Sequence, residues 1–85
     1  MRQFAKLYET EVGQILVKQD EGEEGPEVRL YFTPKNLGVC SIGLTWKEHE
    51  VDAQYEKSDA AFKAMTRETA INLVSDAINT LAKAY

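Results

Sequence analysis

The one cysteine and the one histidine of this chain, Cys40 and His49, are the first candidates for covalent or acid–base chemistry. A cysteine nucleophile needs a neighbouring base and access to solvent. Cys40 lies in a segment of alternating apolar residues, whereas His49 lies nine residues later in a polar segment, so contact between them is not expected. Free cysteines are commonly small apolar core residues, and we expect Cys40 to be buried and unreactive.

Carboxylates flank His49 and recur elsewhere in pairs, as in Glu9 and Glu11. A histidine between Glu48 and Glu50 could help to hold a metal ion, but a lone histidine in a polar segment is more typical of a solvated loop. Two carboxylates act as an acid–base couple only when their surroundings differ strongly, and nothing in the sequence indicates such a difference. We therefore expect no catalytic residues and predict that the protein is not an enzyme.

The densest group of charges lies in the segment Asp20–Pro26. Its four carboxylates are Asp20, Glu21, Glu23 and Glu24. Such oxygens can bind Ca²⁺, but the segment lacks the ligand spacing and the final glutamate of an EF-hand loop. Its two glycines and its proline predict an exposed hairpin loop. We expect no metal and no other cofactor, and we assign the carboxylates to recognition of a partner protein.

Aromatic and basic side chains alternate in the first half of the chain. The aromatic ones are Tyr8, Tyr31, Phe32 and Trp46, and the basic ones are Lys6, Arg29 and Lys47. On a sheet, such a mixture can stack the bases of a single-stranded nucleic acid. A formal net charge of −4 argues against it, because phosphate-binding proteins carry a basic patch. A nucleic-acid-associated regulator acting through an open sheet face stays as the alternative function.

Size and composition indicate a small globular domain. A chain of 85 residues forms one domain, and an apolar fraction of 44% is ordinary for a folded protein. One cysteine excludes an intrachain disulfide framework. The sequence shows no apolar signal segment and no apolar run of membrane-spanning length, so we expect a cytoplasmic protein without a membrane partner.

The last third of the chain predicts the helices. Apolar residues recur at steps of three and four over 67–84, which is typical of an amphipathic helix. They are Ile71, Val74, Ile78, Leu81 and Tyr85, with Ala70 and Ala77 beside them. Thr66 is the predicted N-cap of this helix, and a shorter helix is predicted over 59–65, capped by Ser58 or Asp59.

The first half predicts four strands, at 3–8, 14–19, 27–33 and 39–46. Residues 27–33 and 39–46 alternate between apolar and polar positions, as half-buried antiparallel strands do. Short turns between the strands favour a meander, and 47–57 is predicted to be a polar connection. The expected fold is therefore α+β: a four-stranded antiparallel meander with both helices packed on one face. Val28, Leu30 and Phe32 should face the helices, whereas Arg29 and Tyr31 should lie on the other, open face.

Several short segments together give the chain a family resemblance. They are Gly25-Pro26-Glu27-Val28-Arg29, Leu37-Gly38-Val39-Cys40-Ser41, Asp59-Ala60-Ala61-Phe62 and the alanine-rich helix after them, which cover about half the chain. With these segments the sequence resembles small phage and prophage proteins of unknown activity. The resemblance implies a phage accessory protein that acts on a host protein, and it implies no catalytic residues.

Together these features predict a non-enzymatic, acidic protein-binding module. The predicted binding residues are Asp20, Glu21, Glu23, Glu24, Arg29 and Tyr31. The acidic segments 20–24 and 48–52, both expected in loops, favour a basic partner. The exposed apolar residues of the open sheet face, together with unpaired strand edges, also favour a homodimer.

Overall fold

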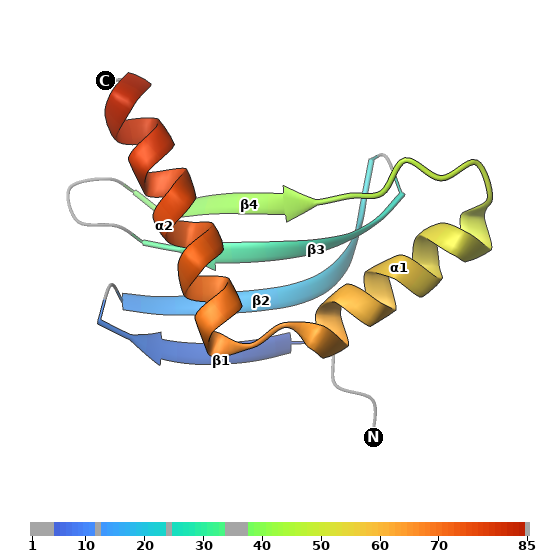
Figure 1. The fold of residues 1–85 in the computed structure, drawn as a ribbon, viewed down its shortest axis with the longest axis horizontal. Helices are drawn as coiled ribbons and strands as arrows, with labels where there is room; N and C mark the ends of the chain where they lie inside the picture. Colours follow the sequence, from blue (N-terminus) through green and yellow to red (C-terminus); the bar gives the residue numbers. More distant parts are fainter. Residues whose placement is uncertain (1–4, 12, 24, 34–37, 85) are drawn as a thin grey trace.

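A computed structural model of the chain describes residues 5–11, 13–23, 25–33 and 38–84, and it has an α+β fold (Figure 1). The four strands are β1 (Ala5–Thr10), β2 (Gly13–Gly22), β3 (Gly25–Phe32) and β4 (Cys40–Leu44). They form one antiparallel sheet in chain order, and the two helices, α1 (Val51–Ala64) and α2 (Arg67–Ala84), both lie over one face of it. The predicted meander with helices on one face is confirmed.

The strand register separates the side chains into two sets. Val17 of β2 lies opposite Leu30 of β3, which lies opposite Ile42 of β4, and these three point toward the helices. We call this side the helix face. The opposite side, the open face, carries the intervening residues, because side chains alternate along a strand. Among the described residues, no element covers the open face (Figure 1).

α1 is twice as long as the helix predicted at its place, since it begins at Val51 rather than at 59. The predicted caps were wrong: Ser58 and Asp59 lie inside α1, and Glu50 occupies the N-cap without a side-chain hydrogen bond. α2 covers the predicted range. Its N-cap is Thr66 as predicted, because the Thr66 hydroxyl accepts a hydrogen bond from the backbone N–H of Thr69 at 3.2 Å.

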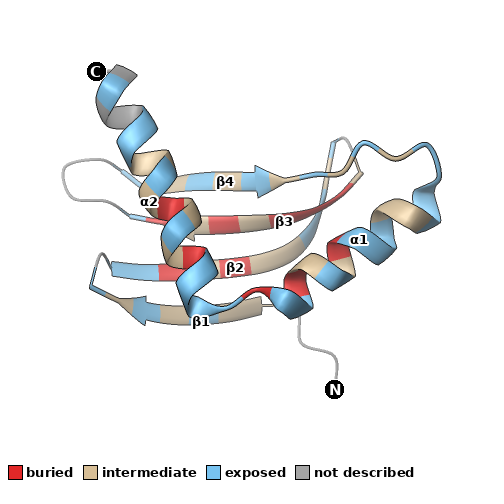
Figure 2. Cartoon of the chain, in the orientation of Figure 1, coloured by how far each residue is buried: buried red, intermediate tan, exposed pale blue. Residues whose placement is uncertain are grey.

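The core lies between the helix face and the two helices, where the buried residues gather along β2 and β3 (Figure 2). It consists of Ile15, Val17, Val28, Leu30, Phe32, Phe62, Met65, Ala70 and Val74. Ile71 and Ile78 of the predicted stripe are half-buried and pack at its margin. The Leu81 side chain and Tyr85 lie outside the part of the chain that the structure describes.

Three side chains tie the edge strand β1 to the junction of the helices. The ammonium of Lys6 donates to the carbonyls of Phe62 (2.6 Å) and Met65 (3.3 Å), and it lies 4.8 Å from the centre of the Phe62 ring. The Tyr8 hydroxyl donates to the Met65 carbonyl at 3.1 Å. Arg67 donates from Nε to the Glu9 carbonyl at 3.1 Å. A cation that binds the last carbonyls of a helix stabilises its C-terminal end, so the Lys6 ammonium caps α1 at that end.

Candidate functional site

The acidic segment Asp20–Pro26 is strand rather than loop over most of its length. Asp20, Glu21 and Gly22 belong to β2 and pair with Glu27, Pro26 and Gly25 of β3. Glu23 lies in the turn, and Glu24 is outside the described residues. The predicted loop was wrong, because the strand ladder continues to Gly22 and Gly25 instead of breaking earlier. The predicted exposure is confirmed for Asp20, Glu21 and Glu23. Gly25 has φ +120°, a conformation that side chains rarely adopt.

The hairpin packs against the first half of α1. Glu21 points to the helix face, where its carboxylate accepts a hydrogen bond from the Tyr55 hydroxyl of α1. This hydrogen bond raises the pKa of Tyr55, because the charged acceptor favours the protonated phenol. Close by, the Gln54 side chain lies against Gly25 and donates to the Glu48 carbonyl at 2.7 Å. The hairpin and the start of α1 thus form one end of the molecule.

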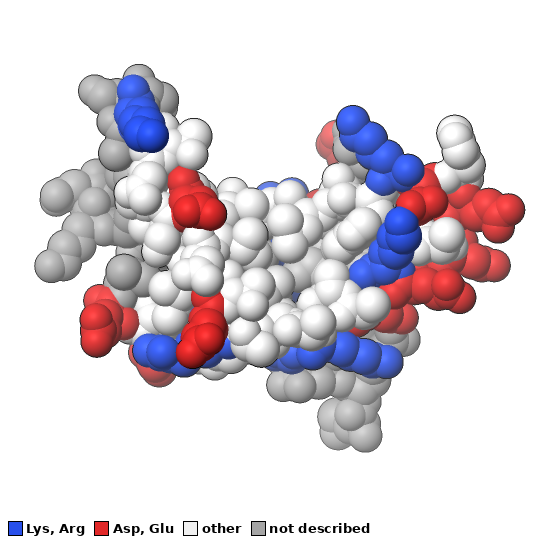
Figure 3. All heavy atoms as spheres, viewed as in Figure 1, with Lys and Arg blue, Asp and Glu red and all other residues white. Residues whose placement is uncertain are grey.

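Carboxylates gather at this end, as Figure 3 shows on the helix side of the molecule. We call it the acidic end and define it by Glu21, Glu23, Glu48, Glu50 and Asp52. Lys57 forms an ion pair with Glu48, whereas Glu23, Glu50 and Asp52 are exposed. The segment 48–52 was expected in a loop, but Asp52 is in the first turn of α1 and Glu50 is its N-cap. Carboxylates at a helix N-terminus are favourable there, which accounts for their placement.

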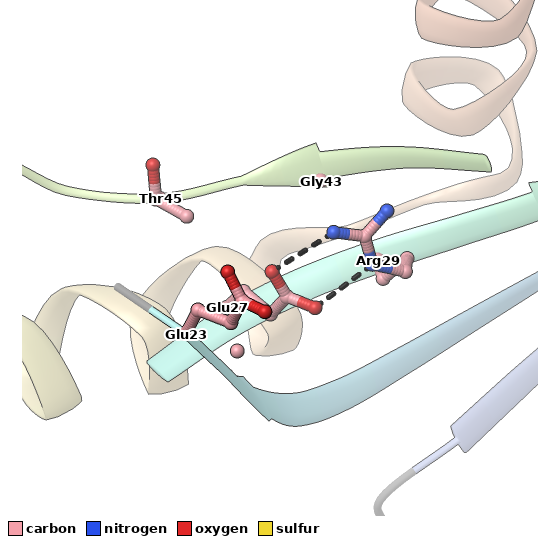
Figure 4. Close-up of a pocket in the computed structure, with 6 residues that line it drawn as sticks. Glu23, Glu27, Arg29, Gly43 and Thr45 are labelled. Atoms are coloured by element: carbon pink, nitrogen blue, oxygen red, sulfur yellow. Dashed lines mark hydrogen bonds and ion pairs between the residues drawn. The ribbon is translucent and has the colours of Figure 1, made fainter. Parts of the chain in front are cut away.

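A polar hollow of about 540 Å³ lies on the open face behind the same hairpin. Its floor is an ion pair within β3, drawn in Figure 4. Arg29 donates from Nε to Glu27 Oε1 at 2.8 Å and from Nη2 to Glu27 Oε2 at 3.1 Å. Its third nitrogen, Nη1, donates to the Ser41 hydroxyl of β4 at 2.9 Å. The two-point hydrogen bond to Glu27 raises the pKa of Arg29.

Two glycines make room for this pair. A Cβ on Gly43 would come within 2.7 Å of Arg29 Nη2, and a Cβ on Gly22 would come within 2.6 Å of Glu27 Oε2. The Glu27 side chain is only 9% exposed and that of Arg29 is 31% exposed. Arg29 was predicted as a binding residue, but Glu27 was not. The Glu-x-Arg spacing on a strand was the signal for Glu27, because residues i and i+2 share one face.

An apolar row crosses the open face beside the hollow. By the register, Leu7 of β1 lies opposite Leu16 of β2, Leu16 opposite Tyr31 of β3, and Tyr31 opposite Ser41. Leu7 is 58% exposed, and Leu16 and Tyr31 are half-buried. Tyr31 therefore lies on the open face as predicted. Asp20 also lies on this face, so the predicted binding residues are divided between the open face and the acidic end.

Cys40 and His49 do not form a site. Cys40 is half-buried on the edge strand β4, not fully buried as predicted, and its thiol donates to the Gly38 carbonyl at 3.5 Å. His49 is exposed in the bend before α1. Within the described residues, no three His, Cys, Asp or Glu side chains lie close enough to hold a metal ion.

None of the described helices is long and apolar enough to cross a membrane. Comparison of the chain with protein-family models, with curated proteins and with solved structures finds no significant match.

Proposed function

We propose that this protein is a non-enzymatic module that binds a basic surface of another protein through its acidic end. One observation supports this proposal above the others: two acidic segments more than 20 residues apart in sequence lie together at one end. The hydrogen bond between Tyr55 and Glu21 joins the β2–β3 hairpin, which carries the first segment, to α1, whose start carries the end of the second. A phage accessory protein acting on a host protein, as the family resemblance implies, would use such a surface.

The exposure of the carboxylates supports the same function. Glu23, Glu50 and Asp52 are exposed, so they can meet the cations of a partner without first breaking a contact with another described side chain. Opposite charges at the rim of an interface mainly accelerate association, and salt screens them over about 10 Å at 0.1 M. We therefore expect an association rate that falls steeply with salt and a dissociation rate that changes less.

The open face is less suited to nucleic acid. The two described cations of this face, Lys18 and Arg29, stand beside Asp20 and Glu27, and the Arg29 guanidinium is already held by Glu27 and Ser41. A protein that follows a phosphate backbone presents cations that release counterions on binding. The charges of this face favour a protein partner over the alternative of a nucleic-acid regulator.

The test compares three forms of the chain as bait for proteins in a lysate of the source organism. One variant removes charge from the acidic end: Glu23→Gln, Glu50→Gln and Asp52→Asn. A matched control removes three exposed carboxylates elsewhere: Glu11→Gln, Glu68→Gln and Asp76→Asn. A partner should bind the wild type and the control and be depleted on the acidic-end variant. With that partner purified, the variant's association rate should fall about tenfold at low salt and approach the wild-type rate at about 0.3 M NaCl.

Two results would contradict the proposal. Equal association rates for the variant and the control would show that the acidic end is only a solvated surface. Capture that disappears after nuclease treatment would favour the nucleic-acid alternative instead.

A further inference from the structure

We propose that a second copy of this chain covers the open face, in a symmetric dimer whose twofold axis runs along the apolar row Leu7–Leu16–Tyr31. The open face is the one broad side of the sheet without a covering element among the described residues. A sheet face that is apolar along its centre commonly packs on another sheet with the strands nearly aligned. The acidic end stays exposed in this dimer, so the inference does not depend on the proposed function.

The rows on either side of the apolar row carry different charges. On one side, Lys18 lies opposite Arg29. On the other side, Glu9 lies opposite Gln14, and the Gln14 amide donates to the Glu9 carboxylate at 2.6 Å. Next to its apolar centre, the open face therefore carries Lys18 and Arg29 on one side and Glu9 on the other. Arg29 is paired with Glu27, and Asp20 and Glu27 lie one row farther out on the first side.

This pattern selects one orientation of the second copy. A twofold axis along the apolar row reverses the strand direction, so it places Lys18 of each copy over the Gln14–Glu9 pair of the other. An axis along the strands would instead place Lys18 over the Glu27-paired guanidinium of Arg29 and away from Glu9, so the attraction between Lys18 and Glu9 would be lost. Charge complementarity thus favours the first arrangement, which contains two equivalent Lys18–Glu9 contacts. Residues at such a twofold interface meet reciprocally.

The area of the face indicates a weak dimer. Four strands spaced by about 4.8 Å and about seven residues at about 3.3 Å each give a footprint of roughly 400 Å² per copy. Both copies together then bury roughly 800–1,000 Å², below the range of about 1,200–2,000 Å² for stable interfaces. We expect a dissociation constant of about 10–100 μM, typical of a contact of this size with a small apolar centre.

Sedimentation equilibrium from about 5 to about 500 μM tests the dimer at low salt. The mass should rise from that of one chain, 9.6 kDa, toward twice that value.

Leu7→Asp replaces an exposed residue, so it should leave the fold intact and weaken the dimer at least tenfold, by the burial of a carboxylate against the partner's apolar row. Lys18→Glu and Glu9→Lys should each weaken the dimer about threefold to tenfold, and the double variant should recover most of the affinity. Lys47→Glu makes the same charge change away from the face and should have no effect. Circular dichroism melts establish that each variant is folded.

A mass of one chain at about 500 μM would overturn the inference, as would a dimer that Leu7→Asp leaves unchanged. A double variant that dimerises no better than the single variants would overturn the proposed orientation. Recovery in the double variant would support it, because loss of folding cannot produce recovery.

Discussion

At the scale of single residues, the Glu27–Arg29 pair is held as much by its surroundings as by its charges. Gly22 and Gly43 leave the space that the two side chains fill, and Ser41 accepts the remaining donor of Arg29. Removing one partner from such a pair leaves a charge with little access to water, which costs more than the pair itself contributes. The pair therefore matters more for keeping the open face in one arrangement than for net stability.

Arg29→Met should lower the free energy of unfolding by about 1–2 kcal/mol. This is less than the cost for a fully buried pair, because Arg29 is 31% exposed. The double variant Arg29→Met/Glu27→Gln should recover about half of that loss, since no carboxylate is then left unpaired. Urea denaturation of the wild type, the single variants and the double variant measures this coupling. If the single and double variants lose equal stability, the carboxylate was never desolvated.

Ser58 differs from the Glu27–Arg29 pair, because its polar group is buried without a described hydrogen-bond partner. It is fully buried between α1 and the sheet, and its hydroxyl has no hydrogen-bond partner among the described residues. Ser58→Ala removes an unsatisfied group and also favours the helix, so it should raise the free energy of unfolding by about 1 kcal/mol. Ser75→Ala, at a half-buried position of α2, is the control. It changes only the helix propensity and should raise the free energy of unfolding by about half as much. A Ser58→Ala variant less stable than the wild type would indicate a bound water or a hidden partner.

At the scale of elements, the strands and α2 could be predicted from the sequence, whereas α1 could be predicted only in part. β3 and α2 carry clear periods of two and 3.6, which large apolar residues make visible. The buried positions of α1 are Ser58 and Phe62 alone, so its inward side shows almost no apolar pattern. The helix also begins without a side-chain cap. The apolar period and the side-chain N-cap, which are the two signals that mark a helix in a sequence, are therefore both weak before Ser58.

The β2–β3 hairpin could not be predicted as strand for a similar reason. Glycine, proline and four carboxylates are typical of a loop, but Glu21 is held by Tyr55, and Pro26 and Glu27 are buried. The contact of Glu21 comes from α1, whose start was predicted at 59 rather than at Val51, and Glu27 is held by Arg29 on the open face. The late predicted start of α1 also hid the acidic end, because Tyr55, which binds Glu21, belongs to the part of α1 that was predicted as a connection.

The packing of α2 against the core should weaken from Val74 to Ile78. Val74 is 1% exposed, whereas Ile78, one turn later, is only half-buried. Val74→Ala should therefore lower the free energy of unfolding by about 2 kcal/mol, and Ile78→Ala by about 1 kcal/mol, although isoleucine loses more carbon atoms. Urea denaturation of the two variants measures this order. The reverse order would mean that the second half of α2 is covered as fully as the first.

At the scale of the whole molecule, the sheet divides two surfaces with different properties. The helix face is closed by α1 and α2, and the open face is left to a partner (Figure 1). The acidic end joins the two sides, because Glu21 reaches the helices while Glu23 lines the hollow on the open face. A module built this way can pair with itself across the sheet and still present its carboxylates to another protein.

The contacts between β1 and the helix junction have a consequence for the order of folding. They join residues 56 to 59 positions apart, from Lys6 with Phe62 to Lys6 with Met65. Closing a loop of this length costs roughly 3–4 kcal/mol of chain entropy, so these contacts should form after the hairpins and helices. Lys6→Met should therefore accelerate unfolding about fivefold and leave the folding rate nearly unchanged. Stopped-flow measurements in urea separate the two rates, with Lys18→Met as the control on the neighbouring strand. Slower folding with an unchanged unfolding rate would instead show that the contacts between β1 and the helix junction are already formed in the folding transition state. If only unfolding is accelerated, then β1, the first strand of this sheet in chain order, is the strand whose attachment to the helices is completed last.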